Sequence, residues 1–322
     1  MTPAPLVSVV TTSFNQAPFL EETIESVLGQ DYAPLEYLIV DDGSSDGSVE
    51  IVRRYADRLA WWTVQPNAGQ SAALSRGFEH ARGDYLGFLS GDDTLLPGAL
   101  RRLVGVLEQS PDAVLVYGDG VYTNECSETI GYAHSRDWDT RWVLSTAKNP
   151  IVQQTTLWRR RAWELAGPLD EGSTYYFDLE LYLRLSVHGR FVRIPEPLAT
   201  VRLHPASKSV ARAVLKARDA GRFADVVLAD AELPAPLRAH AKRGRAAMLL
   251  RSGMNYYAAL DLRDARRQLL RAVAADPGIV SRRWASLTAK SLLPASIVHR
   301  LRERRVRRLR SLALGRGRNA GR

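Results

Sequence analysis

Short apolar runs alternate with amphipathic stretches over the first ninety residues of the chain. The runs are rich in β-branched and aromatic residues, and they predict buried strands at residues 6–12, 35–40, 61–64 and 85–89. Between them, apolar residues at helical spacing predict helices at about residues 19–29, 48–58 and 70–82. Strands and helices that alternate with short connections favour an α/β fold, in which helices flank a mostly parallel sheet on both faces.

Polar side chains cluster where three of these strands end, at residues 11–15, 41–42 and 90–93. Right-handed crossovers bring the carboxyl ends of parallel strands to one edge of a sheet, where ligands bind in open α/β folds. Three polar loops on that edge therefore predict a ligand site. The chain contains neither GxGxxG nor GxxxxGK[ST], so dinucleotide and P-loop functions have no motif support.

Two acidic positions can each be interpreted in two ways. Asp92 and Asp93 suit a hard divalent cation that takes its other ligands from water and phosphate. Alternatively, they cap a helix that begins at Pro97 and turn the chain. Asp178 lies in the first turn of a helix predicted over residues 178–188, where any carboxylate is favoured by the helix dipole. The sequence pattern alone favours neither interpretation of Asp92 and Asp93, whereas for Asp178 it favours a helix cap over a functional carboxylate.

The second half of the chain changes character at about residue 211. Before it, we expect strands at residues 113–118 and 152–158. After it, Ala, Leu and Arg dominate, and helices are expected at residues 211–231, 236–252 and 258–275. Residues 261–277 resemble the second helix and closing Asp-Pro of a tetratricopeptide repeat. Because a solenoid needs about three such units, a helical appendage is expected instead.

The net charge of +9 is concentrated at the end of the chain. Residues 282–322 contain thirteen Arg or Lys and one acid, Glu303, so they carry 13 − 1 = +12, and residues 1–281 carry 9 − 12 = −3. Trp284, leucines at helical spacing and the break at Pro294 predict two short basic amphipathic helices, which suit an anionic membrane surface. The other interpretations are a solvated helix against the acidic body and non-specific binding of nucleic acid.

The composition is that of a soluble globular protein, with 45% hydrophobic residues. No apolar stretch approaches eighteen residues and the first residues lack an export pattern, so neither a spanning nor an export segment is expected. The single cysteine, Cys126, excludes an internal disulfide and an all-cysteine metal site, and the cytoplasm is the expected compartment.

Four motifs in order resemble the family 2 glycosyltransferases, which have the GT-A fold. They lie at residues 9–15, 39–46, 67–77 and 90–93, and the resemblance covers about residues 6–205. It implies a nucleotide-sugar-dependent enzyme with Mg²⁺ or Mn²⁺ on the donor diphosphate. The residues that it implies for nucleotide binding are Thr11, Ser13, Asn15, Asp41, Asp42, Asn67, Gly69, Gln70, Arg76, Ser90 and Arg202.

The resemblance also implies metal ligands at Asp92, Asp93 and His204. The family usually has Asp-x-Asp-Asp where this chain has Ser90 followed by Gly, Asp92 and Asp93, so one carboxylate has become a hydroxyl without charge. We expect His204 to offset that loss. Arg202 and His204 resemble the family's Arg-x-His segment, which closes over the diphosphate.

By the same resemblance, Asp178 is the catalytic base. The family's stretch is Glu-Asp-x-x-x-x-x-Arg, and its Glu is Phe177 here, with Glu180 the nearest substitute. A base that takes the proton of an acceptor hydroxyl in one displacement inverts the sugar's anomeric carbon. Gln153 and Gln154 are candidates for acceptor contact, although a structural role fits them equally well.

The sequence thus predicts an inverting glycosyltransferase that uses a UDP, dTDP or GDP sugar and a glycan or lipid-linked acceptor. We expect a GT-A domain at residues 1–210, a helical appendage at 211–281 and a basic tail at 282–322. Because the family's acceptors are often lipid-linked, the tail is expected to bind the inner face of the cell membrane. The alternative is a catalytically silent nucleotide-sugar-binding scaffold. A nucleic-acid protein would leave the three polar loops unexplained, so no specific nucleic acid is expected.

Overall fold

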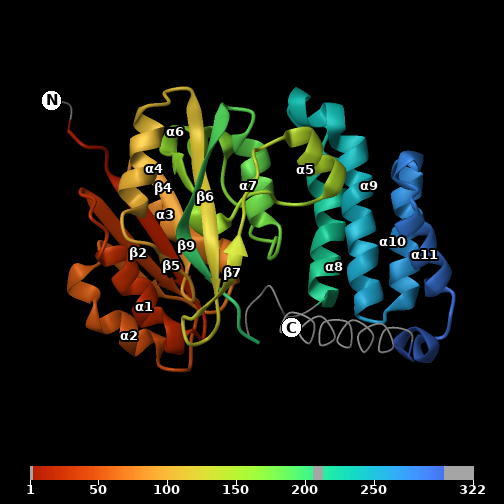
Figure 1. Cartoon of the computed structure of the whole chain (residues 1–322), viewed down its shortest axis with the longest axis horizontal. Helices are drawn as coiled ribbons and strands as arrows, with labels where there is room; N and C mark the ends of the chain where they lie inside the picture. Colours follow the sequence, from red (N-terminus) through yellow and green to blue (C-terminus); the bar gives the residue numbers. More distant parts are fainter. Residues whose placement is uncertain (1–2, 206–212, 301–322) are drawn as a thin grey trace, which may run out of the picture. The chain divides into compact units, whose positions relative to one another are not determined.

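The computed structural model describes residues 3–205 and 213–300 of the chain. The chain divides into two compact units, and Figure 1 labels the helices and those strands for which there is room. The first unit comprises Met1–Leu144, Lys148–Ala211 and Glu232–Ala239. The second comprises Ser145–Ala147, Arg212–Ala231 and His240–Arg322. All of the candidate site residues belong to the first unit.

A sheet of nine strands, counted over the described residues, forms the centre of the first unit. The strand order is β3-β2-β1-β4-β8-β6-β9-β5, and β7 pairs with β6. The first four strands in this order are parallel, as predicted, whereas β8 runs antiparallel to both β4 and β6. The strands are β1 (Val7–Ser13), β2 (Leu35–Asp41), β3 (Trp61–Val64), β4 (Tyr85–Ser90), β5 (Thr94–Leu95), β6 (Ala113–Thr123), β7 (Thr129–Ala133), β8 (Leu157–Arg159) and β9 (Arg190–Arg202).

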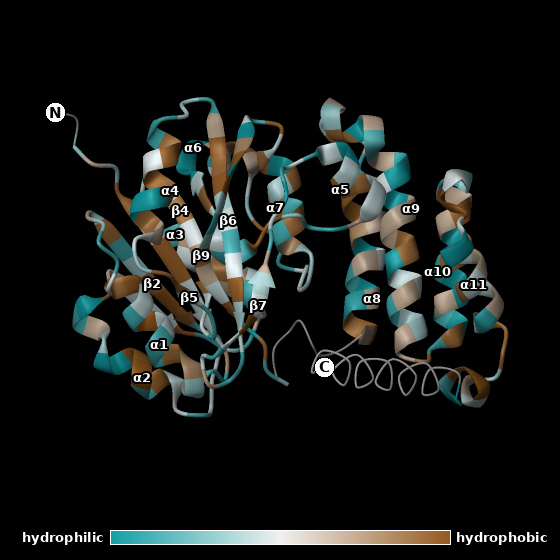
Figure 2. Ribbon diagram, in the orientation of Figure 1, coloured by the Kyte–Doolittle hydropathy of each residue, from teal (hydrophilic) through white to brown (hydrophobic). Residues whose placement is uncertain are grey.

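Helices cover both faces of this sheet because its strands are apolar on both sides, as the brown central strands in Figure 2 show. On β1, Val9 packs in one buried cluster with α1, α2 and α4, and the next residue, Val10, packs in the other with α3, α6 and α7. The helices and 3₁₀ turns of the first unit are α1 (Ala17–Leu28), α2 (Ser48–Arg54), η1 (Ala56–Arg58), α3 (Gln70–His80), α4 (Ala99–Glu108), α5 (Thr140–Thr146), whose last two residues belong to the second unit, η2 (Gln153–Thr155), α6 (Arg160–Ala166) and α7 (Phe177–Leu185).

The sheet curls so that the end of β9 meets the acidic turn after β4. The short strand β5 pairs Thr94 with Thr200 and Leu95 with Ala199. Residues 91–93 therefore bridge from the end of β4 to the end of β9. This pairing puts Arg202 and the residues after it beside Asp92 and Asp93, more than a hundred positions earlier in the chain.

In the first unit, two local predictions are wrong and one strand was missed. The helix expected at Pro97 begins at Ala99, because Gly98 with φ of +79° precedes it and residues 94–95 join the sheet instead. Residues 152–158 were expected to form one strand, but they contain the 3₁₀ turn η2 and only then β8. Strand β9 was not predicted at all.

The second unit is helical, as predicted. Its elements are α8 (Ala213–Arg222), the π-helical turn η3 (Phe223–Val227), α9 (Ala235–Ala258), α10 (Leu262–Ala275), the 3₁₀ turn η4 (Pro277–Ile279) and α11 (Arg282–Ser291), and the first residues of α9 belong to the first unit. The break expected at residues 253–257 is absent, since α9 runs through it. There Gly253 permits close packing, because a Cβ atom would lie 2.9 Å from Cγ of Leu269.

The predicted basic tail is only partly described. Helix α11 carries Trp284, whose ring N–H donates a hydrogen bond to the carbonyl of Leu269 on α10 at 2.9 Å. Residues 301–322, which hold most of the predicted basic segment, lie outside the described residues. Within residues 3–205 and 213–300, no helix has the length and apolar character needed to cross a membrane.

Candidate functional site

The acidic turn after β4 is anchored by Asp93. Its carboxylate accepts a hydrogen bond from the backbone N–H of Arg202 at 2.8 Å and one from the Gln154 amide at 2.7 Å. The Asp93 side chain is buried, and this burial, followed by the negative charge of Asp92, raises its pKa well above the usual range. Asp93 therefore joins the turn to β9 and η2 from inside the protein.

Asp92 is paired with His204. Nε2 of the imidazole lies 3.0 Å from Oδ2 of Asp92, and the histidine ring packs at 4.8 Å from the ring of Phe19. Both residues are about nine-tenths buried. A carboxylate oxygen and an imidazole nitrogen thus face one another at the strand's carboxyl end.

Arg202 supports this turn with its whole side chain. Its guanidinium donates to the carbonyls of Asp92 and Asn124, to the hydroxyl of Ser127 and to the carboxylate of Glu22. The side chain is only 1% exposed and lies over the ring of Phe19 at 4.8 Å. In this arrangement the guanidinium is directed at protein acceptors.

The carboxylates at the end of β2 hold the neighbouring loops in place. Asp41 accepts hydrogen bonds from the backbone N–H and the hydroxyl of Ser44. Asp42 accepts from the Gln65 amide and from the backbone N–H groups of residues 68 and 69. Both carboxylates are buried, so their hydrogen bonds determine the loops that carry Asn67 and Gly69.

At the end of β1 lie a buried hydroxyl that is hydrogen-bonded, a buried hydroxyl without a described partner, and an exposed amide. Thr11 is buried in the core and accepts a hydrogen bond from the hydroxyl of Tyr37 at 2.9 Å. Ser13 is 1% exposed, and its hydroxyl has no hydrogen-bond partner among the described residues. Asn15 is exposed with φ of +52°, and its side-chain oxygen accepts from the backbone N–H of Ser45 at 2.9 Å.

Gln70 links this part of the site to the acidic turn. At the start of α3, its amide donates to the hydroxyls of Ser90 at 3.1 Å and Thr12 at 3.4 Å. Arg76 and Asn67 are exposed, and Arg76 contacts the Gln65 amide oxygen at 3.4 Å. The structure thus joins the three predicted loops through side-chain contacts.

Asp178 lies at the start of α7 and is held by a residue that the sequence did not reveal. The Asn149 amide donates to Oδ2 of Asp178 at 2.9 Å, and the backbone N–H of Leu179 donates to Oδ1 at 2.7 Å. Phe177 packs in the core, and Glu180 lies 3.9 Å from Arg184 on the same helix. No local pattern marks Asn149, because its role depends on a partner 29 positions away.

Both predicted acceptor residues lie in η2 and donate hydrogen bonds within the protein. Gln153 donates to the carbonyl of Phe88 at 2.9 Å, and Gln154 donates to Asp93. Among residues 3–205 and 213–300, no group of three or more His, Cys, Asp or Glu side chains is placed to hold a metal ion. Any cation at Asp92 and His204 would take its further ligands from water or a substrate.

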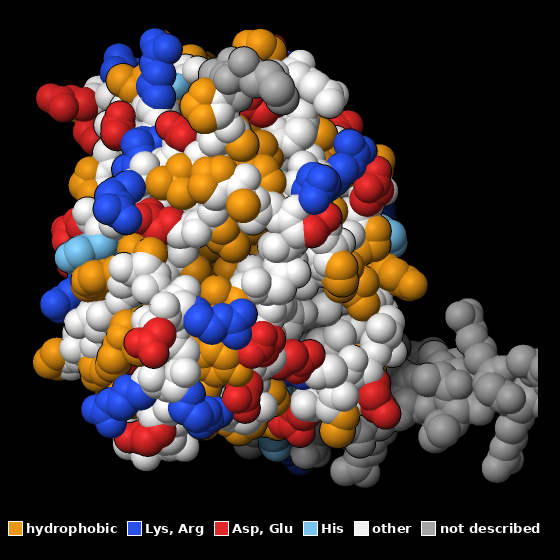
Figure 3. Space-filling model, turned by 90° about the vertical axis from the view of Figure 1, so that its left-hand side faces the viewer, with side chains coloured by type: hydrophobic (Ala, Val, Ile, Leu, Met, Phe, Trp, Pro, Cys, Tyr) orange, Lys and Arg blue, Asp and Glu red, His pale blue; other side chains and the backbone are white. Residues whose placement is uncertain are grey.

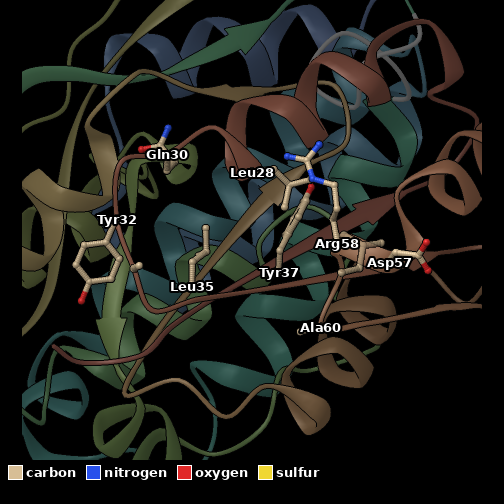
Figure 4. Close-up of a pocket in the computed structure, with 10 residues that line it drawn as sticks. Leu28, Gln30, Tyr32, Leu35, Tyr37, Asp57, Arg58 and Ala60 are labelled. Atoms are coloured by element: carbon tan, nitrogen blue, oxygen red, sulfur yellow. The ribbon is translucent and has the colours of Figure 1, made fainter. Parts of the chain in front are cut away.

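A separate hollow of about 430 Å³ lies at the opposite end of β2, where Figure 4 shows Leu35 and Tyr37 in its wall. Two of its polar groups are already bound within the chain: the Gln30 amide donates to two carbonyls, and the Tyr32 hydroxyl donates to the carbonyl of Pro5. Because Asp41 ends the same strand at the other edge of the sheet, this hollow is not part of the candidate site.

The chain is similar to proteins of known class. It is 42% identical to EpsJ of Bacillus subtilis strain 168, described as an uncharacterized glycosyltransferase, over 108 residues, which are 33% of this chain and 31% of EpsJ. The crystal structure of S. aureus TarS 1-349 with UDP-GlcNAc has a TM-score of 0.64 at 17% identity and covers 92% of this chain and 87% of that one.

A second solved structure has the same fold. It is the mannosyltransferase PcManGT from Pyrobaculum calidifontis in complex with GDP-Man and Mn²⁺, with a TM-score of 0.57 at 21% identity over 90% of this chain and 80% of that one. These likenesses confirm the predicted GT-A architecture. The model of glycosyl transferase family 2 matches residues 8–179, which include the three polar strand ends and Asp178. The chain therefore belongs to glycosyl transferase family 2.

Proposed function

We propose that this protein transfers a sugar from a nucleoside diphosphate to a hydroxyl group of a glycan or a lipid-linked acceptor. The observation that carries the proposal is the acidic turn, where Asp92 and His204 face one another beside loops that Asp41 and Asp42 hold in place. TarS binds UDP-GlcNAc and PcManGT binds GDP-Man, which supports a UDP or GDP sugar, with a dTDP sugar as the third candidate.

Nucleotide binding fits the groups at the ends of β1 and β4. The Ser13 hydroxyl is buried without a partner among the described residues, and such a group costs stability unless a ligand or water pairs with it. Asn15 and Gln70 add amides at the same edge of the sheet. We assign base and ribose contacts to these residues, and to Asn67 and Arg76 at the exposed rim.

Asp92 and His204 fit a divalent cation that also binds a diphosphate. The carboxylate of Asp92 suits Mn²⁺, and Mg²⁺ commonly takes one or two carboxylates together with substrate phosphates, whereas the imidazole of His204 is a ligand for transition metals rather than for Mg²⁺. A bound cation would stabilise the negative charge that develops on the departing diphosphate. Asp93 and Arg202 hold the turn from behind, and Ser90 adds a neutral hydroxyl beside it.

Asp178 is the proposed base. It would accept the proton of the acceptor hydroxyl while that oxygen attacks the anomeric carbon, and the single displacement inverts the configuration there. The hydrogen bonds from Asn149 and from the Leu179 N–H keep the carboxylate in one orientation. An oriented acceptor and base contribute to rate by removing the entropy cost of their encounter.

The decisive experiment compares Asp178→Asn with the wild type in donor consumption, with Mg²⁺, with Mn²⁺ and with a chelator. We expect a loss of about 10²-fold to 10⁴-fold in kcat for the variant, because it keeps the shape and loses the base. A matched control is Glu164→Gln on the neighbouring helix α6, an exposed carboxylate that should leave kcat unchanged. Wild-type turnover by Asp178→Asn would reject this base.

The second candidate is a catalytically silent nucleotide-sugar-binding scaffold, and the observation in its favour is Phe177. The aromatic ring is buried in the core where the resembling family carries Glu, so one acidic group is missing beside Asp178. Calorimetry that finds tight binding of a nucleoside diphosphate, with no product from any acceptor, would favour this candidate.

We also propose that residues 282–322 bring the protein to the anionic inner face of the cell membrane. Their charge of 13 − 1 = +12 supports this, at about 1 kcal/mol for each basic residue near the surface. An acceptor carried by a lipid would then be concentrated in the same plane as the enzyme.

A further inference from the structure

Residues 149–154 hydrogen-bond at both ends to carboxylates of the proposed site. At one end the Asn149 amide donates to Asp178 at 2.9 Å, and at the other the Gln154 amide donates to Asp93 at 2.7 Å. We propose that residues 149–154, which we name the bridging segment, are a positioning element that fixes the base relative to the acidic turn. The proposal rests on the proposed function and assigns a role to Asn149, which no sequence motif marks.

The Asn149 end has a determined orientation. Its side-chain oxygen accepts a hydrogen bond from the backbone N–H of Ile151 at 3.0 Å, so the NH₂ group is the one directed at Asp178. Pro150 follows and restricts Asn149 to an extended backbone. Because Leu179 donates to the other oxygen of Asp178, both carboxylate oxygens receive a donor whose position is fixed.

The Gln154 end is equally constrained. Thr155, which is fully buried, exchanges hydrogen bonds with the backbone N–H and carbonyl of Gly118 on β6. Gln153 donates to the carbonyl of Phe88 on β4. The turn η2 is therefore fixed to two strands of the sheet. Its fixed backbone holds the Gln154 amide in position to donate to Asp93.

The length of the bridging segment limits the separation of the two acids. Six residues span at most roughly 20 Å when fully extended, and the 3₁₀ turn at their end shortens this further. Asp93 is adjacent to Asp92 in the chain, so the base and the metal-binding carboxylate are tied to one short stretch of backbone. A misplacement of about 1 Å in such a site can cost 10²-fold in rate.

Asn149→Asp tests the first end. The variant keeps the shape of the side chain and the acceptor for the Ile151 N–H, but it turns an oxygen toward the carboxylate of Asp178. We expect kcat to fall by about 10-fold to 100-fold. The donor KM and the Mn²⁺ concentration for half-maximal activity should stay within about twofold of the wild type, because this end does not touch the acidic turn. Asn149→Ala serves as the second variant if Asn149→Asp does not fold.

Gln154→Leu tests the Gln154 end of the bridging segment, and it should change the Mn²⁺ requirement rather than kcat. It removes the donor to Asp93, so the Mn²⁺ concentration for half-maximal activity should rise by about fivefold or more, as outer partners of metal ligands typically tune affinity. At saturating Mn²⁺, kcat should recover to within about threefold of the wild type. Two variants in one segment would then affect two different kinetic constants.

Leu103→Ala is the control for a merely structural role. Leu103 is buried in the core on α4 and belongs neither to the bridging segment nor to the proposed site, so the cavity should lower the midpoint of thermal unfolding and leave the kinetic constants per folded enzyme unchanged. The proposal is overturned if Asn149→Asp retains wild-type kcat, or if all three variants share one kinetic pattern. Full activity of Asp178→Asn would instead reject Asp178 as the base, and a wild type that consumes no nucleotide-sugar donor would reject the proposed function, so the failures are distinguishable.

Discussion

Arg202 illustrates how a buried cation can serve a site through the backbone that it organises. Its guanidinium donates to the carbonyl of Asp92, to the β6–β7 turn at Asn124 and Ser127, and to Glu22 on α1. Three segments far apart in the chain are thereby fixed to one planar group. A guanidinium can do this because its donors lie in a rigid fork, which a lysine ammonium lacks.

Arg202→Lys is expected to lower the free energy of unfolding by about 2 kcal/mol or more, because it leaves Glu22 and buried carbonyls without their donors. The control is Arg101→Lys, whose ion pair with Asp31 is exposed and should contribute less than about 1 kcal/mol. Urea unfolding of both variants gives the comparison. Equal stability of the two would show that the Arg202 contacts contribute little.

A second buried charge, Asp119, makes stability depend on pH. Burial alone would raise its pKa, but hydrogen bonds from Ser135, His134 and Arg193 outweigh burial and lower the pKa to about 2. A carboxylate whose pKa is lower in the folded state stabilises the protein above its unfolded pKa of about 3.9. That contribution is lost as the pH falls from about 4 to about 2.

Asp119→Asn should therefore be less stable than the wild type at pH 7, by on the order of 2 kcal/mol. The difference should shrink as the pH falls below about 4, because the wild type then loses the same charge. Urea midpoints measured between pH 7 and pH 2.5 check this, with Glu50→Gln on the exposed face of α2 as the control. A difference that does not vary with pH would show that the ionised state of Asp119 is not what stabilises the fold.

Two glycines in helices differ in the space that an added Cβ atom would find. Gly77 on α3 faces β1, and a Cβ atom there would lie 2.3 Å from Cγ1 of Val10, whereas a Cβ on Gly105 of α4 would meet nothing within 4 Å. Gly77→Ala should destabilise by about 1–3 kcal/mol through overpacking against a β-branched side chain. Gly105→Ala should stabilise by about 0.5–1 kcal/mol through helix propensity.

Thermal or urea unfolding of the two variants checks this pair directly, since both make the same chemical change in a helix of the same unit. A stabilised Gly77→Ala would show that α3 can move away from β1. That result would also question how rigidly the start of α3, which carries Gln70, is held against the sheet.

The first four strands were predictable because each is apolar on both faces and bounded by turns. Strand β9 was not, because residues 190–202 contain four charges and two prolines, and the strand is specified by its pairing with β6. That pairing shifts register near Pro197. Strand β5 has two residues, too few for any periodic signal.

The sequence predicts where the site lies in the fold, but it does not predict the hydrogen-bond partners of the site residues. Strand ends located Asp42, Asp92 and the polar loops, because parallel strands share an edge. Whether a side chain faces a ligand or holds a loop depends on tertiary partners. The sequence around Asp42 does not indicate which of these roles its side chain has. In the structure, the Asp42 carboxylate accepts three hydrogen bonds from residues 65–69.

Charge is divided unevenly along the chain. Residues 1–281 carry −3 and residues 282–322 carry +12, and on the side of the molecule shown in Figure 3 acidic and basic side chains are interspersed. Trp284 donates its ring N–H to α10, so the indole is engaged within the second unit. Any attraction to an anionic surface should therefore come from the basic residues and should depend strongly on salt.

Replacing Arg304, Arg305, Arg307 and Arg308 with Gln tests this attraction. Each basic residue contributes about 1 kcal/mol near anionic lipid, so the variant should lose about 4 kcal/mol of binding to vesicles that contain phosphatidylserine, nearly three orders of magnitude in affinity. Vesicles of phosphatidylcholine should bind neither protein. Wild-type binding should fall steeply between 0.1 M and 1 M salt, because the Debye length shortens from about 10 Å to about 3 Å.

The matched control removes the same charge from the first unit, by Gln at Arg53, Arg54, Arg58 and Arg101, whose side chains are all more than half exposed. If net charge alone drew the protein to the membrane, both sets of replacements would weaken binding equally. A tail that concentrates the charge predicts a loss for the first set and little change for the second, because attraction decays within a Debye length of the surface. An equal loss of vesicle affinity in the two variants would show that residues 282–322 are not the specific membrane contact.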